Sequence, residues 1–206
     1  MYISFFSEPQ IPDGLKKLRE NYKRNGIPTI LEQSLNLLIL TVSIKKPLKI
    51  LEIGTATGMS GIAMLSNARE AELVTIEKDE DSFLESKANF KEYKLSHKIK
   101  QFLGDAGDIL TFLDGHFDFI FLDGAKARYY DYLHDVKRLL APGGVLFADN
   151  VLFRGFVDGS EKHGHGNNTI VRNLRAFIND VVKDDNFITQ VINVGDGILI
   201  SQKKNA

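Results

Sequence analysis

The chain has 206 residues, with 26 Lys and Arg against 27 Asp and Glu, a formal net charge of −1 and no cysteine. This balance argues against a surface coated with basic residues for nucleic acid, and the lack of cysteine excludes disulfides, thiolate zinc sites and cysteine nucleophiles. The length predicts a single domain over residues 1–206. Residues 1–9 lack the pattern of a signal peptide, and the apolar stretch 35–44 is too short to span a bilayer. We therefore expect no membrane contact and a cytoplasmic location.

The predicted elements begin with two helices, over residues 13–24 and 30–44, which make residues 1–46 an N-terminal helical cap before a core over 47–206. From there strands and helices alternate. The predicted strands are residues 49–53, 73–77, 99–103, 117–122 and 144–148, and the predicted helices are 58–66, 79–92, 106–113 and 129–140. Such alternation predicts right-handed crossovers and a parallel sheet with helices on both faces.

The pattern changes after Asn150. A polar, glycine-rich loop over 155–168 leads to a predicted helix at 169–182 and two strands at 187–194 and 198–201. Gly195-Asp196-Gly197 between these strands is a strong hairpin signal. The sequence therefore predicts an α/β fold with a mostly parallel, seven-stranded sheet that ends in an antiparallel hairpin.

The basic residues are unevenly distributed along the chain. Residues 13–49 contain three acidic and eight basic side chains, the latter being Lys16, Lys17, Arg19, Lys23, Arg24, Lys45, Lys46 and Lys49. This segment is either a solvated helix face or a local phosphate-binding edge.

A glycine turn, Gly54-Thr-Ala-Thr-Gly58, follows the first predicted strand. In an open α/β sheet, ligands bind beyond the carboxyl ends of the strands, where glycine lets the backbone approach them closely. The turn has neither the dinucleotide spacing G-x-G-x-x-G nor a P-loop lysine. Glu52, inside the strand, would repel a pyrophosphate but attract a cation. S-adenosylmethionine (SAM), which carries a sulfonium and an ammonium, therefore fits best.

The next two strands also end in acidic residues. Glu77 closes the second strand, where a carboxylate can accept hydrogen bonds from both ribose hydroxyls, and Gly104-Asp105-Ala106 closes the third, where an adenine would lie. Each of these residues also has an explanation without a cofactor. Glu77 can be an exposed acid, Asp105 can be a helix cap, and Ser60 can be an ordinary residue in the first turn of a helix. Together, such ends at successive strands favour a nucleoside-type cofactor.

Two later strands end in Asp123 and in Asp149-Asn150. Each follows a short apolar run, as expected of a strand that is buried on both faces. If these strands are neighbours, their ends lie roughly 5 Å apart, and two carboxylates and an amide converge. Oxygen ligands of this kind suit a hard divalent cation such as Mg²⁺. Lys126 is either a base beside that cation or a surface lysine that opens a helix.

Six segments carry a family resemblance: LEIGTATGMS, VTIEKDE, GDA, FLDGAK, ADNVLFRG and VGDGI. From about residue 26 to 203 the chain resembles the class I SAM-dependent methyltransferases, specifically the cation-dependent O-methyltransferases related to the catechol and caffeoyl-CoA enzymes. Within that group, GIPTILEQ, DNVLFRG and VGDG make it similar to the bacterial tRNA 5-hydroxyuridine methyltransferases.

The resemblance implies a Rossmann-like fold, a homodimer and a metal site for Mg²⁺, Mn²⁺ or Ca²⁺ at Asp123, Asp149 and Asn150. It implies Lys126 and Asp123 as catalytic residues, with Lys126 taking the acceptor's proton, and residues 28–30 lying over the cofactor. The implied SAM site consists of Ile30, Glu52, Gly54, Thr55, Gly58, Ser60, Glu77, Asp105, Ala106 and Asp123.

Three functions stay open at this point. The first is O-methylation of 5-hydroxyuridine at the tRNA wobble position, the second the same chemistry on a small catechol-like or thioester-linked phenol, and the third a non-catalytic SAM-binding module. Arg128 and Arg154 are either phosphate contacts or ordinary surface arginines. His163 and His165 belong either to a second metal site or to a polar loop that covers the substrate.

Overall fold

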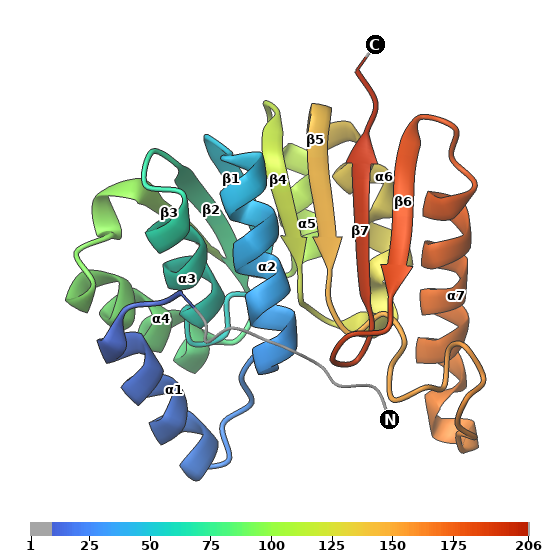
Figure 1. Ribbon diagram of the computed structural model, residues 1–206, viewed down its shortest axis with the longest axis horizontal. Coiled ribbons are helices and arrows are strands. Elements are labelled where there is room, and N and C mark those ends of the chain that lie inside the picture. The colour runs from blue at the N-terminus through green and yellow to red at the C-terminus, as the bar shows by residue number, and fades with distance from the viewer. Residues whose placement is uncertain (1–9, 206) are drawn as a thin grey trace.

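In the computed structural model, which describes residues 10–205, one seven-stranded sheet is flanked by helices (Figure 1). The strands are β1 (Lys49–Ile53), β2 (Glu72–Glu77), β3 (Ile99–Leu103), β4 (Phe117–Leu122), β5 (Leu140–Ala148), β6 (Phe187–Ile192) and β7 (Ile198–Lys203). Their order in the sheet is β3-β2-β1-β4-β5-β7-β6, and only the pairs that involve β7 are antiparallel. The predicted α/β class and the closing antiparallel pair are confirmed.

Seven α-helices and three 3-10 turns connect the strands in the described part of the chain. The helices are α1 (Asp13–Arg24), α2 (Glu32–Lys45), α3 (Met59–Asn67), α4 (Glu80–Glu92), α5 (Ala106–Phe112), α6 (Tyr129–Leu139) and α7 (Asn168–Val182). The 3-10 turns are η1 (Ser96–Lys98), η2 (Lys126–Arg128) and η3 (His165–Asn167). Among residues 10–205, no helix has both the length and the apolar character needed to cross a bilayer. The signal-peptide prediction for residues 1–9 lies outside the described residues.

Several predicted element boundaries were wrong. Strand β6 ends at Ile192 rather than at residue 194, and β7 continues to Lys203 rather than ending at residue 201. Strand β5 begins at Leu140 rather than at residue 144, because it pairs with β4 first at Leu140 and again from Val145, with Pro142 and Gly143 in a bulge between. A bulge absorbs the residues that the sequence suggested as a loop. Helix α2 begins at Glu32 rather than at residue 30, because the preceding residue, Leu31, has an extended backbone.

The core forms one layer on each face of the sheet. Alternate residues of β4 point to opposite faces, so that Phe119 and Phe121 pack with α1 to α4, while Ile120 and Leu122 pack with α5 to α7. Figure 1 shows α2 and α3 in front of the sheet and α5 and α6 behind it. Burial on both faces explains why the parallel strands are short, continuous apolar runs.

The carboxyl ends of the parallel strands meet at the lower edge of the sheet in Figure 1. The sheet hydrogen bonds continue past the last strand residues, from the amide of Asp123 to the Ile53 carbonyl (3.0 Å) and from the amide of Asp149 to the Leu122 carbonyl (3.0 Å). The residues that follow β4 and β5 are therefore held by the sheet itself.

Candidate functional site

Two adjoining cavities lie at this carboxyl edge, with volumes of about 290 Å³ and 240 Å³. The larger cavity follows the ends of β1 to β4, and the smaller one reaches from the 28–31 segment to the end of β5. We call them the cofactor cavity and the acceptor cavity, after the ligands that the sequence predicts for their lining residues. Gly54, Ala56 and Asp123 line both, so the two cavities form one continuous site.

The structure brings most of the predicted site residues to these cavities. Gly54, Glu77, Asp105, Ala106 and Asp123 line the cofactor cavity. Ile30, Gly54, Thr55, Ser60, Asp123, Lys126, Asp149 and Asn150 line the acceptor cavity. Glu52 and Gly58 line neither one.

The glycine turn packs so closely that side chains are excluded at both of its ends. Gly54 has a φ of +98°, and a β-carbon there would collide with the backbone carbonyl of Asp123. Gly58 has a φ of +81°, and a β-carbon there would lie 2.8 Å from the ring of Phe90. Gly58 therefore seats the turn on α4, while Gly54 lets β1 and β4 approach each other where the site begins.

Glu52 lies beneath the glycine turn instead of lining a cavity. Its buried carboxylate accepts hydrogen bonds from the hydroxyls of Ser60 and of Thr75, the latter at 2.7 Å. Burial raises the pKa of Glu52 to about 7, although both hydrogen bonds oppose that shift. Glu52 thus reaches the acceptor cavity through Ser60, so Ser60 is both a first-turn helix residue and part of the cavity wall.

The carboxylate of Glu77 supports the backbone around the cofactor cavity. One oxygen accepts a hydrogen bond from the amide of Ala56 (2.8 Å), and the other accepts from the amides of Lys78 and Asp79 (both 2.9 Å). The end of β2 is thereby joined to the glycine turn. Glu77 also lines the cavity, so it is not simply an exposed acid.

Asp105 caps α5, which is one of its two predicted roles, and it also lines the cofactor cavity. Its Oδ1 accepts a hydrogen bond from the amide of Gly107 (2.8 Å), and its Oδ2 lies 3.6 Å from the guanidinium of Arg128. Arg128 also pairs with Asp131 at 2.7 Å and lies over the ring of Tyr132. Sequence reasoning missed Tyr132 as a cavity residue, although its spacing from Arg128 places both on one side of α6.

Asp149 is buried and its side chain is fixed from two directions. Its Oδ1 accepts hydrogen bonds from the Ser34 hydroxyl (3.1 Å) and from the amide of Asn150 (2.7 Å). The hydroxyl of Tyr129 donates to the carbonyls of Leu122 (3.2 Å) and Asp149 (3.1 Å), which holds the ends of β4 and β5 together.

The positive charge of Lys126 compensates the two carboxylates at this point only in part. Burial, and next the neighbouring Asp149, raise the pKa of Asp123 to about 8, while Lys126 opposes the rise. Burial also raises the pKa of Asp149, against the hydrogen bonds from Asn150 and Ser34. A cation between the two would favour their ionised forms. In the described part of the chain no three His, Cys, Asp or Glu residues cluster as metal ligands. Asn150 lines the same cavity as the two carboxylates, and its amide oxygen would be the third ligand. Two carboxylates and an amide fit a hard divalent cation.

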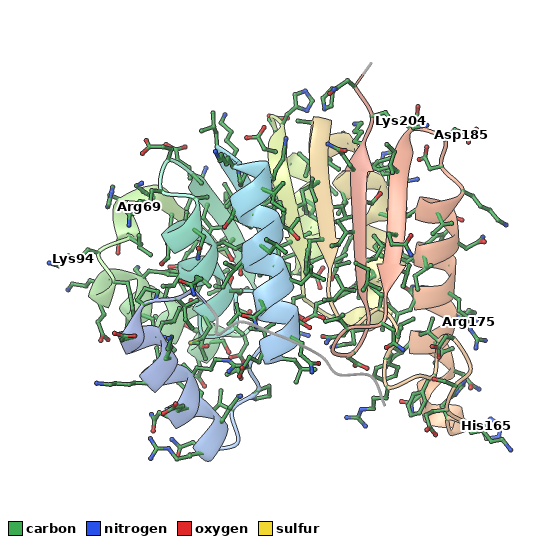
Figure 2. All side chains as sticks on the ribbon, viewed as in Figure 1. Arg69, Lys94, His165, Arg175, Asp185 and Lys204 are labelled. Atoms are coloured by element: carbon green, nitrogen blue, oxygen red, sulfur yellow. The ribbon has the colours of Figure 1, made fainter. Side chains whose placement is uncertain are left out.

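Arg154 and the two loop histidines lie away from both cavities. The amide of Arg154 donates a hydrogen bond to Asp196 in the hairpin between β6 and β7. His163 packs against Phe156, with ring centroids 5.6 Å apart, and Figure 2 shows His165 at the lower periphery of the molecule. Arg175, also labelled in Figure 2, holds the loop on α7 through the carbonyls of Val157 and Phe156. With no metal-binding cluster in residues 10–205, nothing supports a second metal at these histidines.

Comparison with known proteins identifies the chain. The family model described as O-methyltransferase matches residues 7–204. Caffeoyl-CoA O-methyltransferase 2 from Zea mays is 27% identical over 95% of this chain and 78% of that protein. A match to O-methyltransferase hkm8 from Aspergillus hancockii is 32% identical but covers 54% of this chain and 46% of that protein.

Solved structures agree with these sequence matches. A candidate caffeoyl-CoA O-methyltransferase from Staphylococcus aureus superimposes with a TM-score of 0.85 at 27% identity, covering 93% of each chain. The O-methyltransferase TomG from Streptomyces achromogenes, solved in complex with SAM, gives a TM-score of 0.82 at 25% identity, covering 95% of this chain and 92% of TomG. Membership of this family makes SAM the cofactor and O-methyl transfer the reaction. The chain belongs to the O-methyltransferase family, in the group of caffeoyl-CoA O-methyltransferase-like proteins.

Proposed function

We propose that this O-methyltransferase acts on a hydroxyl with a neighbouring second oxygen, with a divalent cation held by Asp123, Asp149 and Asn150. The observation that carries this proposal is the convergence on one cavity wall of two carboxylates with raised pKa values, the buried Asp149 and the partly buried Asp123. Such a pair is costly to ionise unless a cation joins it. When bound, the cation would orient the acceptor and make its hydroxyl more acidic.

In this proposal Lys126 takes the acceptor's proton. It lines the acceptor cavity with Asp123 and Asp149, and as a neutral amine its Nζ would have a free electron pair for that proton. Once the hydroxyl has given its proton to Nζ of Lys126, the acceptor oxygen forms a bond to the methyl carbon as the carbon–sulfur bond of SAM breaks. Gly54 and Asp123 contribute to both cavities, so they would fix the line between donor and acceptor, and such positioning supplies much of the rate.

As acceptor we propose 5-hydroxyuridine at the tRNA wobble position, whose hydroxyl and adjacent carbonyl form a chelating pair. Exposed Lys17, Lys23 and Arg24 of α1 lie next in the chain to the 28–31 wall of the acceptor cavity and would contact the RNA backbone. Arg19 is buried, and Lys49 begins β1 at the opposite edge of the sheet, so neither is available to that RNA. A tRNA acceptor also agrees with the cytoplasmic location expected from the sequence.

A small catechol-like or caffeoyl-CoA-like phenol is the second candidate, and the name of the Zea mays relative favours it. A catechol offers the same pair of neighbouring oxygens to the cation. It needs no basic surface, however, so the two candidates differ in their dependence on α1.

The test uses methyl-labelled SAM with tRNA that carries 5-hydroxyuridine, with catechol and with caffeoyl-CoA, each with Mg²⁺ and with chelator. We expect the native protein to label tRNA, and we expect this label to be lost with chelator and in Asp149→Ala. The double variant Lys17→Glu/Lys23→Glu should methylate tRNA more slowly but should methylate the two phenols at the native rate. Label in catechol or caffeoyl-CoA but not in tRNA would replace the RNA assignment with the phenol one. Transfer that persists with chelator would refute the metal site.

We also propose that the protein is a homodimer paired through an apolar stripe of α2 and the residues that follow it, namely Leu37, Leu40, Ile44 and Leu48. Leu40, Ile44 and Leu48 are 55%, 74% and 60% exposed. Figure 1 shows α2 on the outside of the sheet. An exposed apolar stripe of this kind is normally covered, and a two-fold axis would pack two such stripes together. Light scattering should give a dimer for the native protein and a monomer for Ile44→Asp, whereas a native monomer would contradict the proposal.

A further inference from the structure

The buried face of α1 is unusual because two of its three buried side chains are polar. Leu15, Arg19 and Tyr22 lie on this face at helical spacing. The side chain of Arg19 is 8% exposed, and its Nε has no hydrogen-bond partner among the described residues. Burying a guanidinium costs free energy unless the group is paired. The contacts of Arg19 should therefore show what role the buried side chain has.

Arg19 holds the segment that forms one wall of the acceptor cavity. Its Nη2 donates a 3.0 Å hydrogen bond to the carbonyl of Ile30, and its Nη1 lies 3.3 Å from the carboxylate of Glu32 at the start of α2. The cavity wall consists of Pro28, Thr29, Ile30 and Leu31. Leu31 precedes α2 with an extended backbone and no side-chain cap. Residues 28–31 lie before α2, and their position is not fixed by helix geometry. Arg19 therefore fixes the position of this cavity wall.

Tyr22, three residues further along α1, reaches the facing wall through Asn89 of α4. The Nδ2 of Asn89 donates to the Tyr22 hydroxyl at 2.9 Å and to the carbonyl of Thr57 at 2.8 Å. Thr57 belongs to the glycine turn and lines the acceptor cavity with Thr55. Tyr22 and Asn89 are both buried, so this bridge between α1 and the glycine turn is protected from water.

We propose that α1 is a clamp that sets the separation of the two walls of the acceptor cavity, with Arg19 and Tyr22 as positioning residues for bound SAM. The clamp rests on the proposed SAM site at the glycine turn. Arg19 and Tyr22 lie within one turn of the same helix. Movement of either cavity wall should therefore move α1, and through α1 the other wall. The two contacts should therefore act on ligand binding as a unit and not as two local supports.

The test is a double-mutant cycle with Arg19→Met, Tyr22→Phe and the combined variant, read by calorimetric titration with S-adenosylhomocysteine. Each single variant should bind this product about 3- to 10-fold more weakly, as expected for one lost buried hydrogen bond. The combined variant should lose clearly less than the product of the two single effects, because the first substitution already releases the helix. The KM for SAM should rise more than kcat falls. Glu20→Gln, on the exposed face of α1, should bind like the native protein.

Thermal unfolding of every variant separates a clamp from a folding defect, and Arg19→Lys replaces Arg19→Met if the latter does not fold. Single variants that fold and bind S-adenosylhomocysteine as the native protein does would overturn the clamp. Single effects that multiply fully in the combined variant would overturn it too, since the two contacts would then be independent. If the native protein itself does not bind S-adenosylhomocysteine, the SAM site of the proposed function fails first, which is a distinguishable result.

Discussion

The hydroxyl of Ser34 donates a 3.1 Å hydrogen bond to Oδ1 of Asp149, a residue 115 positions later in the chain. Ser34 is buried in α2, whereas Asp149 follows β5 and lines the acceptor cavity. This contact, with the Asn150 amide on the same oxygen, orients the carboxylate and would leave its other oxygen for the proposed cation. Groups that orient a metal ligand in this way support metal affinity.

Ser34→Ala should therefore weaken divalent-metal binding about 10-fold, in line with other supporting contacts of metal ligands. Titration of Mn²⁺ with detection by electron paramagnetic resonance measures this directly and does not require turnover. Ser43→Ala, on the same helix, is the matched control. Equal Mn²⁺ affinity in Ser34→Ala and the native protein would show that the hydrogen bond does not serve the metal.

Lys126→Met should lower kcat about 10²- to 10⁴-fold, the range expected for loss of a general base. Because we expect SAM to contact the glycine turn and the cofactor cavity, the affinity for S-adenosylhomocysteine should stay unchanged. Steady-state kinetics and calorimetry on one preparation measure both quantities. Lys183→Met, an exposed substitution after α7, should keep full activity. A Lys126→Met enzyme with native turnover would revive the reading of a surface lysine.

Glu52 should make the stability of the protein depend on pH. Its pKa is raised from 4.5 to about 7 in the fold, so between these values the folded chain binds more protons than the unfolded one. The free energy of unfolding should then fall as the pH rises through this window. Glu52→Gln removes the titrating group, so its midpoint temperature should vary less between pH 5 and 8.

The measurement is thermal unfolding with chelator at several pH values, where each kcal/mol shifts the midpoint by about 2–4 °C in a chain of this size. Glu80→Gln, an exposed change on α4, should keep the native dependence. A Glu52→Gln profile parallel to the native one would show that Glu52 titrates normally.

Gly54→Ala and Gly115→Ala separate backbone strain from steric collision. Both glycines have positive φ, +98° and +92°, but a β-carbon at Gly115 would meet nothing within 4 Å. Gly115→Ala should cost only the strain of an L-residue in this region, about 1–2 kcal/mol. Gly54→Ala should cost more and should also abolish S-adenosylhomocysteine binding, because the Asp123 carbonyl must move. Urea denaturation measures the free energy of unfolding of both variants, and calorimetry measures their affinity for S-adenosylhomocysteine. Equal values for the two variants would contradict a steric collision at Gly54.

Much of the fold could be predicted from local patterns. Runs such as Phe117–Leu122 are strands because only a strand buried on both faces needs so short and continuous an apolar run. The glycines of the 54–58 turn, and the acidic residues after successive strands, indicate the ligand edge, since parallel strands end together. Asp123, Lys126 and Asp149 could therefore be assigned to one site before any coordinates were known.

Contacts between distant residues could not be predicted in this way. Ser34 appears in the sequence as a polar residue of an apolar helix and Arg19 as one cation of a basic helix, yet the fold buries both and places each against a cavity wall. Glu52, expected beside the cofactor, lies beneath the glycine turn because the hydroxyls of Ser60 and Thr75 surround its carboxylate there. The sequence by itself determined the strands, the turn and the ligand edge, because these follow from periodicity and backbone preference within a few residues. Only the tertiary structure decided which polar side chains are buried and what they hold, because that depends on packing between helices that the chain separates.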